Sequence, residues 1–403
     1  MKVLVTSDLH LADRIWKHRP IEGDSYAAWQ AIVRYALDED NEINEVIIAG
    51  DILDKQTNQS TAIHHLTIGL SSLIEAGIRV YFNQGQHCMQ EKPWPSLVDG
   101  VRHLKFQDMY NVGGLMMTGF DYCSREQLQE NLKDESVAKA DILVCHQVWE
   151  DFMGGVGNPQ GCFEDIPDNV KYLITGDYHE NICKRAAQTD IKLRGLYVGL
   201  IDGDAAEGLV VISPGSTHLR SISEPDDKYF WVVEIADGTS PHIHSVEIPG
   251  RRRFELKMTA WDGVQAVFPE ALDQVIRASL DMNEDYWDGR QPELIRDSGL
   301  GKPLIRIVHN SDQLDTACKS VISKYAEDAH FFYKIVRPEA ENDLDVLEYV
   351  DASDRLKMID CLDTAVDQKE RPQAHSLATA LLGGGEPEQV LQKWIKEQIN
   401  EGS

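Results

Sequence analysis

Two pairs of an aspartate and a histidine two positions apart each follow shortly after an apolar run in this 403-residue sequence. The first pair is Asp8 and His10, and the second is Asp177 and His179. In extended chain, side chains two residues apart leave the same face, so each pair can direct a carboxylate and an imidazole at one point. Both groups are common ligands of divalent metal ions. The spacing therefore indicates metal binding, or acid–base chemistry by the same groups.

Three more apolar runs end in residues of these kinds. Asp51 follows a run that closes with a glycine, Gln86 and His87 follow a second run, and His146 ends a third. A lone histidine after a strand is usually structural, and a lone Gly-Asp usually caps a turn or helix. Five such endings in succession are different, because a two-metal site needs about four ligands per ion from a rigid scaffold. The pattern predicts that these side chains converge.

The elements that would position these residues alternate between strands and helices. Short apolar runs predict buried strands at residues 2–6, 46–49, 79–82, 141–145 and 172–175. Helices are predicted between the first three strands, and Asp24 or Ser25 would cap the first of them, over 24–38. This β-α-β-α-β order is typical of a sheet layered with helices. The polar groups would then lie at the carboxyl edge of the sheet, where open α/β sheets bind ligands.

Composition places the chain among ordinary soluble globular proteins, with 42% hydrophobic and 26% charged residues. It has no apolar run long enough to span a membrane, and its N-terminus does not resemble a signal peptide. The seven cysteines are scattered without a Cys-x-x-Cys pair, so we expect a cytoplasmic protein. The net charge of −28 argues against broad electrostatic capture of nucleic acid. It fits a protein that binds cations, or one that a partner brings to DNA.

The ordered motifs resemble those of the calcineurin-like metallophosphoesterases. That family's blocks are DxH, GDxxD, GNH(D/E), a lone His and GHxH, and their counterparts here are Asp8–His10, Gly50–Asp54, Gly85–Cys88, His146 and Gly176–His179. Within the superfamily the chain looks most like the SbcD/Mre-type DNA repair nucleases, including phage forms. Ser213–Thr217 matches their PGS segment, and an acidic loop and a strand at 229–235 follow it. The resemblance implies an α/β fold, a layered β-sandwich flanked by helices.

The resemblance also implies two divalent metal ions. The first ion would be held by Asp8, His10, Asp51 and His179, and the second by Asp51, Gln86, His146 and Asp177, with Asp51 bridging. His87 would stand beside the scissile phosphate and give a hydrogen bond or a proton to the leaving oxygen. Water would attack the phosphorus in line.

Two positions depart from the family pattern, and both fall on the second ion. Gln86 stands where the family has asparagine, and Asp177 stands where it has the first histidine of GHxH. Glutamine is longer than asparagine and aspartate reaches less far than histidine, so we expect the two changes to compensate. Three oxygens and one nitrogen favour Mn²⁺, or Mg²⁺, over Zn²⁺. The other interpretation is a degraded second site and weak or absent catalysis.

The resemblance covers about residues 1–250, which we interpret as the metallophosphoesterase (nuclease) domain. Residues 251–340 are predicted to form a small α+β capping domain that holds DNA, built on a β-α-β unit over 303–336. Arg251-Arg252-Arg253 at the boundary is interpreted as a solvated linker, with phosphate contact as the alternative.

Residues 341–403 are predicted to form a helical tail. Gly383–Gly385 interrupts it, and Glu386–Ile399 has the apolar spacing of an amphipathic helix. In the resembling nucleases, helices after the cap bind the coiled-coil base of an SMC-like ATPase. The resemblance therefore implies that partner together with DNA, a homodimer and no membrane, in the host cytoplasm if a phage encodes the chain. Docking of the last helix on the chain's own body is the other interpretation.

The sequence thus favours a metal-dependent DNA nuclease, the nuclease subunit of a two-protein complex that processes DNA ends. The family implies 3′-to-5′ exonuclease and single-strand endonuclease activity. One alternative is a phosphoesterase that uses the same two ions on small nucleotides or proteins, which the acidic charge favours. Another is a DNA-end-binding scaffold whose catalysis is weak.

Overall fold

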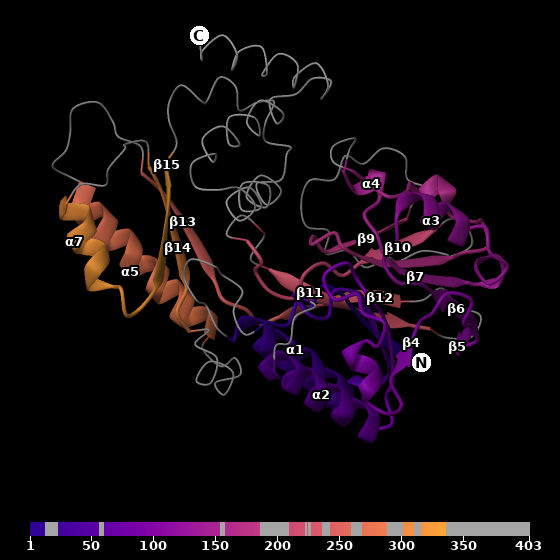
Figure 1. Cartoon of the computed structure of the whole chain (residues 1–403). Coiled ribbons are helices and arrows are strands. Elements are labelled where there is room, and N and C mark those ends of the chain that lie inside the picture. Colours follow the sequence, from indigo (N-terminus) through magenta and orange to yellow (C-terminus); the bar gives the residue numbers. More distant parts are fainter. Residues whose placement is uncertain are drawn as a thin grey trace, which may run out of the picture. The chain divides into compact units, whose positions relative to one another are not determined.

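The structure is a computed structural model of the chain (Figure 1). It describes residues 1–12, 23–55, 60–153, 158–185, 209–221, 224, 227–235, 242–258, 268–287, 301–309 and 316–335. By internal contacts the chain divides into the units Met1–Pro338 and Glu339–Ser403. The second unit, with the tail helices predicted for it, lies outside the described residues. The domain boundaries proposed from the sequence therefore stay predictions.

The first sheet has six strands in the order β12-β11-β1-β2-β3-β4. Its strands are β1 (Lys2–Thr6), β2 (Ile43–Ala49), β3 (Arg79–Asn83), β4 (Arg102–His103), β11 (Lys228–Glu234) and β12 (His242–Ile248). The strands from β1 to β4 are parallel, whereas β11 runs antiparallel to β1 and β12 runs antiparallel to β11. Helices α1 (Asp24–Leu37) and α2 (Ser60–Glu75) cover the outer face (Figure 1).

The second sheet also has six strands, in the order β5-β6-β7-β8-β10-β9. Its strands are β5 (Tyr110–Val112), β6 (Leu115–Gly119), β7 (Ile142–His146), β8 (Tyr172–Gly176), β9 (Ile182–Arg185) and β10 (Val210–Ser213). The short helices α3 (Arg125–Asn131) and α4 (Glu150–Met153) lie over the outer side of this sheet (Figure 1). Leu128 of α3 packs there against Leu143 and Leu173.

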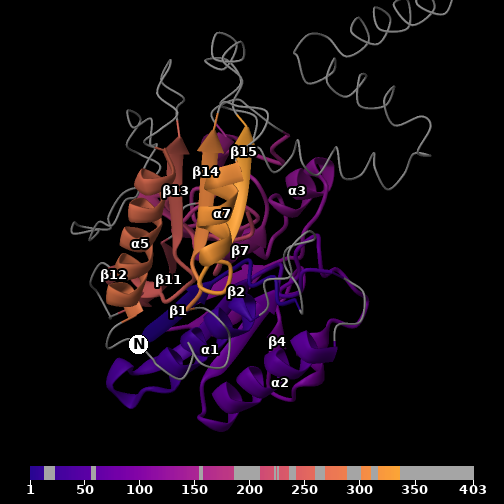
Figure 2. The same cartoon turned by 90° about the vertical axis from the view of Figure 1, so that its left-hand side faces the viewer.

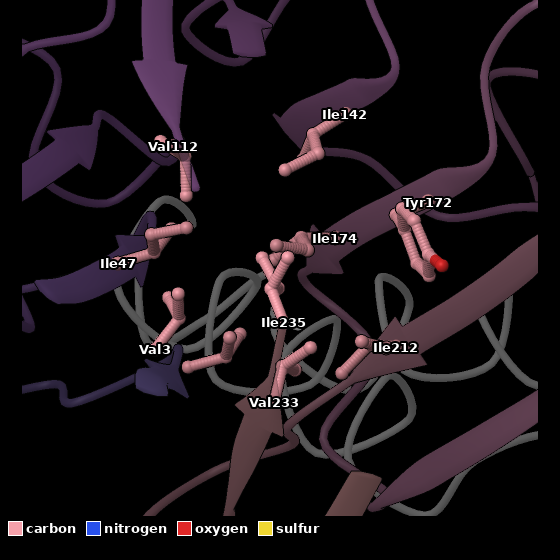
Figure 3. A pocket seen from close by; sticks show the side chains of 10 residues that line it. Val3, Ile47, Val112, Ile142, Tyr172, Ile174, Ile212, Val233 and Ile235 are labelled. Carbon is pink, nitrogen blue, oxygen red and sulfur yellow. The ribbon is translucent and has the colours of Figure 1, made fainter. Parts of the chain in front are cut away.

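The two sheets pack face to face, which is why their strands are apolar on both sides. In β1, Leu4 faces the cluster under α1 and α2, whereas Val5 joins the cluster between the sheets. Figure 3 shows part of that inner cluster, where apolar side chains from both sheets surround a small cavity of about 20 Å³. The layered α/β sandwich predicted from the sequence is confirmed.

A third sheet of three parallel strands follows the sandwich in the chain. It consists of β13 (Arg253–Met258), β14 (Leu304–His309) and β15 (His330–Ile335), joined through α5 (Phe268–Trp287) and α7 (Thr316–Lys324). Both helices lie on one face of it, and Ile276 of α5 packs against Ile305 and Ile307 of β14 (Figure 2). The predicted β-α-β unit is confirmed as β14-α7-β15. Within the described ranges, no helix combines the length and the apolar composition needed to cross a bilayer.

The interpretation of the arginine run as a solvated linker is wrong for Arg251. This side chain is buried, and its Nε and Nη2 donate to the two carboxylate oxygens of Asp24 at 2.8 and 2.6 Å. Its Nη1 donates to the carbonyl of Lys302 at 2.6 Å. The next residue, Arg252, pairs with Asp227 at 3.0 Å. Arg251 and Arg252 thus bind carboxylates of the chain itself, and Arg251 is not available to phosphate.

The predicted cap of α1 is also wrong. Gly23 occupies the N-cap position and no side chain caps the helix there. The Asp24 carboxylate is taken up by Arg251, and the Ser25 hydroxyl bonds the backbone of Ala12 instead. Long-range partners have therefore replaced the local cap that these two residue types usually provide.

Candidate metal centre

All eight side chains predicted for the site come from the carboxyl ends of parallel strands, or from the turn just after them. The first sheet contributes from β1, β2 and β3, and the second from β7 and β8. Because the sheets face each other, strand ends distant in sequence meet at one edge. The side chains brought together are Asp8, His10, Asp51, Gln86, His87, His146, Asp177 and His179.

Four of these residues have left-handed backbone conformations that non-glycine residues rarely adopt. The φ angles are 48° for Asp8, 39° for His10, 42° for Asp51 and 75° for Asp177. Each such residue costs on the order of 1–3 kcal/mol, so the surrounding structure must hold it. The amide of Asp8 donates to the carbonyl of Gly50 at 3.2 Å, and that of His10 donates to the carbonyl of Asp51 at 2.8 Å. These bonds tie the ends of β1 and β2 together.

The residues predicted for the first ion form one connected group. His10 Nε2 lies 3.7 Å from an oxygen of Asp8 and 3.7 Å from an oxygen of Asp51. His179 Nε2 lies 3.8 Å from the same Asp8 oxygen. Asp8, His10 and His179 offer three ligand atoms within 4.8 Å of one another. This separation matches the spread of ligands that share one ion.

The residues predicted for the second ion are adjacent to that group. His146 Nε2 lies 3.3 Å from Asp51 Oδ2 and 3.9 Å from Asp177 Oδ1. Gln86 Nε2 donates to the same Asp177 oxygen at 2.9 Å. Gln86 and Asp177, the two residues that depart from the family pattern, therefore contact each other. His146 Nε2 is also 3.9 Å from Asp8 Oδ1, so Asp8 borders both groups.

Asp51 lies at the centre of the site. Its Oδ2 atom is within 4 Å of ring nitrogens of His10, His87 and His146. Its Oδ1 atom accepts a hydrogen bond from the backbone amide of His87 at 2.9 Å. One oxygen is thus fixed by the chain and the other faces both groups, which is the position that a bridging ligand needs.

Three buried polar atoms test whether this donor set fits metal ions. Asp51 Oδ2, His10 Nε2 and His146 Nε2 have no hydrogen-bond partner among the described residues. A buried polar atom without a partner costs about 1–3 kcal/mol, and native structures rarely leave several together. A carboxylate and two imidazoles aimed at one space fit divalent cations. The residues present therefore suit the metal site that the sequence predicts.

The opposite nitrogens of the histidine rings are held by other parts of the chain. His146 Nδ1 lies 2.8 Å from the carbonyl of Ala49, and His179 Nδ1 lies 3.2 Å from Glu224 Oε1. Histidines that bind metals usually donate their second N–H to such an acceptor, which fixes the tautomer and the ring orientation. These contacts leave each Nε2 for the site.

Glu224 was not predicted from the sequence, although it lies in the acidic loop after the PGS segment. Its carboxylate accepts hydrogen bonds from Lys228 Nζ at 2.9 Å and from Ser216 Oγ at 3.2 Å, besides its contact with His179. Burial would raise the pKa of Glu224, but Lys228 and His179 hold it well below its usual value. An ionised Glu224 therefore orients His179.

Asp54 and Arg220 form a second support that the sequence did not indicate. Arg220 Nη2 lies 3.0 Å from Asp54 Oδ1, and the same oxygen is 3.8 Å from His10 Nδ1. The carbonyl of Asp54 lies 3.2 Å from His87 Nδ1. Asp54 is the last residue of the GDxxD block, so its motif was found although no role was predicted for it. Its carbonyl contacts the ring of His87, and its carboxylate lies near His10 without a hydrogen bond to it.

The charges of the site shift its pKa values in opposite directions. Burial, with the nearby Arg220 guanidinium, lowers the pKa of His10 well below the usual value. Burial would also lower the pKa of His146, but the Asp51 carboxylate raises it well above that value. The pKa of Asp51 is lowered by His146 against the effect of burial, whereas burial raises the pKa of Asp177. Densely packed carboxylates of this kind need cationic partners.

Two glycines allow the strand ends to approach. A Cβ atom at Gly176 would collide with the carbonyl of Ala49 and the ring of His146, and one at Gly50 would collide with the same ring. Gly50 also has a φ of 82°, which favours glycine. The glycines of the GDxxD and GHxH blocks thus make room for His146 between the sheets.

Comparison with known proteins finds one family model that matches part of the chain. Residues 1–181 match the family described as calcineurin-like phosphoesterase. Among solved structures, the chain is similar to a purple acid phosphatase from yellow lupin (Lupinus luteus) seeds, at 12% sequence identity and a TM-score of 0.39. That likeness covers 61% of this chain and 51% of the other, so the chain spans about half of that structure's length. No curated protein matches the chain.

Proposed function

We propose that this protein hydrolyses phosphodiester bonds of DNA with two divalent metal ions, because residues 1–181 match the calcineurin-like phosphoesterase family. The observation that carries the proposal is the convergence of seven other predicted side chains with Asp51, whose Oδ2 atom has no hydrogen-bond partner among the described residues. The choice of DNA is supported by the resemblance to SbcD/Mre-type nucleases. It is also supported by the third sheet, which follows the sandwich where those nucleases have a cap.

Asp8, His10, Asp51 and His179 would hold one ion, and Asp51, Gln86, His146 and Asp177 would hold the other. When bound, the ions would supply Lewis acids for the phosphoryl oxygens and lower the pKa of a water molecule. The second set is rich in oxygen, which favours Mn²⁺ or Mg²⁺. Gln86 must present its side-chain carbonyl oxygen to an ion. At present its Nε2 atom faces Asp177, and a flip of the amide group by about 180° would put the oxygen there instead.

His87 is the residue of this site that is placed to transfer a proton. Its side chain is 32% exposed, whereas those of Asp51 and His10 are buried, so it faces the side from which substrate arrives. Its Nδ1 lies 3.2 Å from the carbonyl of Asp54, which can accept a hydrogen bond from a protonated Nδ1. Nε2 is then free to donate to the leaving oxygen when the ring carries both protons. Asp54 holds the ring in this orientation.

The acidic charge of the chain requires an explanation in a DNA enzyme. With a net charge of −28, the protein gains little from the phosphate backbone at long range. We propose that an SMC-like ATPase, bound by the C-terminal segment, supplies the basic DNA surface, and that the protein acts as a homodimer. Residues 251–340 would then act locally as the cap over the substrate.

A second candidate function is hydrolysis of small phosphoesters by the same residues, and the acidic charge favours it. A third is a DNA-end-binding scaffold with little catalysis. The hydrogen bond between Gln86 and Asp177 favours the scaffold, because each side chain then satisfies the other in place of an ion. The three functions make different predictions for one experiment.

The test is cleavage of end-labelled duplex and single-stranded DNA in Mn²⁺, Mg²⁺ or EDTA, with a chromogenic phosphodiester and a phosphomonoester in parallel. His87→Gln is compared with His64→Gln, an exposed histidine on α2. We expect DNA cleavage that EDTA abolishes and that His87→Gln lowers roughly 10²–10⁴-fold, with His64→Gln unchanged. Cleavage of small esters alone, with and without the ATPase, supports the second function. No hydrolysis of any substrate with metal bound refutes the nuclease.

A further inference from the structure

A second cluster of metal-binding side chains lies on the hairpin of β11 and β12. Glu234, His242 and His244 each offer one ligand atom, and the three atoms lie within 4.8 Å of one another. Figure 2 shows β11 and β12 side by side in the first sheet. The phosphoesterase chemistry uses none of these residues, and the sequence motifs did not indicate them.

The register of the hairpin places all three side chains on one face. Glu234 pairs directly with His242, and His244 pairs with Val232. Residues two apart in a strand leave the same face, and directly opposite residues share a face, so the carboxylate and both rings gather there. His242 Nδ1 lies 4.0 Å from Glu234 Oε1, and the two rings are 5.4 Å apart between centroids.

One atom of the cluster is buried without a partner. His244 Nδ1 is covered by protein and makes no hydrogen bond among the described residues. Leaving a buried ring nitrogen unpaired is unfavourable, and a metal ion would satisfy it. Lys2 Nζ lies 4.0 Å from Glu234 Oε1 but is nearer to Glu42, at 3.3 Å. Lys2 therefore keeps a carboxylate partner if Glu234 turns toward an ion.

We propose that Glu234, His242 and His244 bind a divalent ion of the Zn²⁺ type, with water completing the coordination. Two imidazoles and one carboxylate favour Zn²⁺, Co²⁺ or Cu²⁺ over Mg²⁺ and Mn²⁺. Tetrahedral coordination with bonds of about 2.0–2.1 Å brings ligand atoms to about 3.3 Å from one another. The side chains of Glu234 and His242 are 38% and 44% exposed, so rotation of these two closes the present gap.

This ion would be separate from the two-ion centre. Lys2, which pairs with Glu234 across β1 and β11, precedes Asp8 by six residues of extended chain, or roughly 20 Å. The two sites therefore lie toward opposite ends of β1. The ion would link β11 to β12, the edge strand of the first sheet, which pairs only with β11 in that sheet.

The experiment is equilibrium dialysis of the full chain against Zn²⁺, with bound metal measured by mass spectrometry. The wild type should retain one equivalent of Zn²⁺ more than the double variant His242→Gln/His244→Gln. Glu234→Gln should lower the affinity for that additional Zn²⁺ at least tenfold. His64→Gln, an exposed histidine elsewhere, should keep the full content. Phosphoester hydrolysis in Mn²⁺ should be the same in all of them, which separates this site from the proposed function. Equal zinc content in the wild type and the double variant would overturn the proposal.

Discussion

Arg251 links the start of the third sheet to the first helix of the sandwich, and its truncation should be costly. Its side chain is 1% exposed and that of Asp24 is 4% exposed, so the pair is shielded from water. Removing one partner of a buried pair leaves an uncompensated charge, which costs about 3–5 kcal/mol. Asp24 also lies in the first turn of α1, where the helix dipole favours a negative charge by about 0.3–1 kcal/mol. We therefore expect Arg251→Met to cost about 3 kcal/mol, the lower end of the range.

The assay is urea unfolding followed by tryptophan fluorescence, since Trp29 is buried within α1. The double variant Asp24→Leu/Arg251→Met should recover most of the loss, because apolar residues then fill the site without a buried charge. Arg277→Met is the control, since Arg277 pairs with Asp273 but is 66% exposed, and should cost less than about 1 kcal/mol. A cost below about 1 kcal/mol for Arg251→Met, or additive costs for the two single variants, would refute the reasoning.

Three more predictions concern the site and its surroundings. Glu224→Gln should weaken metal binding about 10–100-fold by calorimetry, because His179 loses its charged acceptor; unchanged affinity would contradict this. It should also lower the free energy of unfolding, because the buried Lys228 loses its carboxylate partner. Gly176→Ala should destabilise by about 1–3 kcal/mol and abolish metal binding, whereas Gly250→Ala, where a Cβ would lie 3.8 Å from the carbonyl oxygen of Ile248, an ordinary contact, should do neither. Burial lowers the pKa of His218 to about 3. Its contribution to stability is therefore present above pH 6.5 and is lost as pH falls toward 3. Over that range the unfolding free energy should fall by about 1.4 kcal/mol per pH unit because of this one group. His218→Asn should remove that part of the pH dependence, as measured by urea unfolding at several pH values.

The strand ends of the site could be predicted from the sequence because their signals are local. Lys2–Thr6 was predicted as a strand and β1 has those bounds. An apolar run buried on both faces and a glycine before Asp51 are both visible in a few consecutive residues. Parallel strands then bring such endings together without further information. The convergence of these side chains therefore followed from their positions, whereas their roles as metal ligands were implied by the family resemblance and stay predictions.

The supporting residues could not be predicted because their partners are distant in sequence. Glu224 binds His179 from 45 residues away, and Arg251 binds Asp24 from 227 residues away. A charge run is usually solvated, and nothing near Arg251 in the sequence indicates burial. The hairpin cluster at Glu234 was missed for a related reason, since only the register of β11 and β12 brings it opposite His242.

The long-range pairing of β1 has a consequence for how this protein is made. Lys2 pairs with Glu234, and Asp24 pairs with Arg251, so the first residues to be synthesised wait for partners near residue 250. At about 5–20 residues per second, the ribosome needs roughly 10–45 s to reach Arg251 from Asp24. During that time β1 has an open edge. A fragment that stops at residue 181, where the family match ends, lacks β11 and therefore leaves that edge of β1 unpaired.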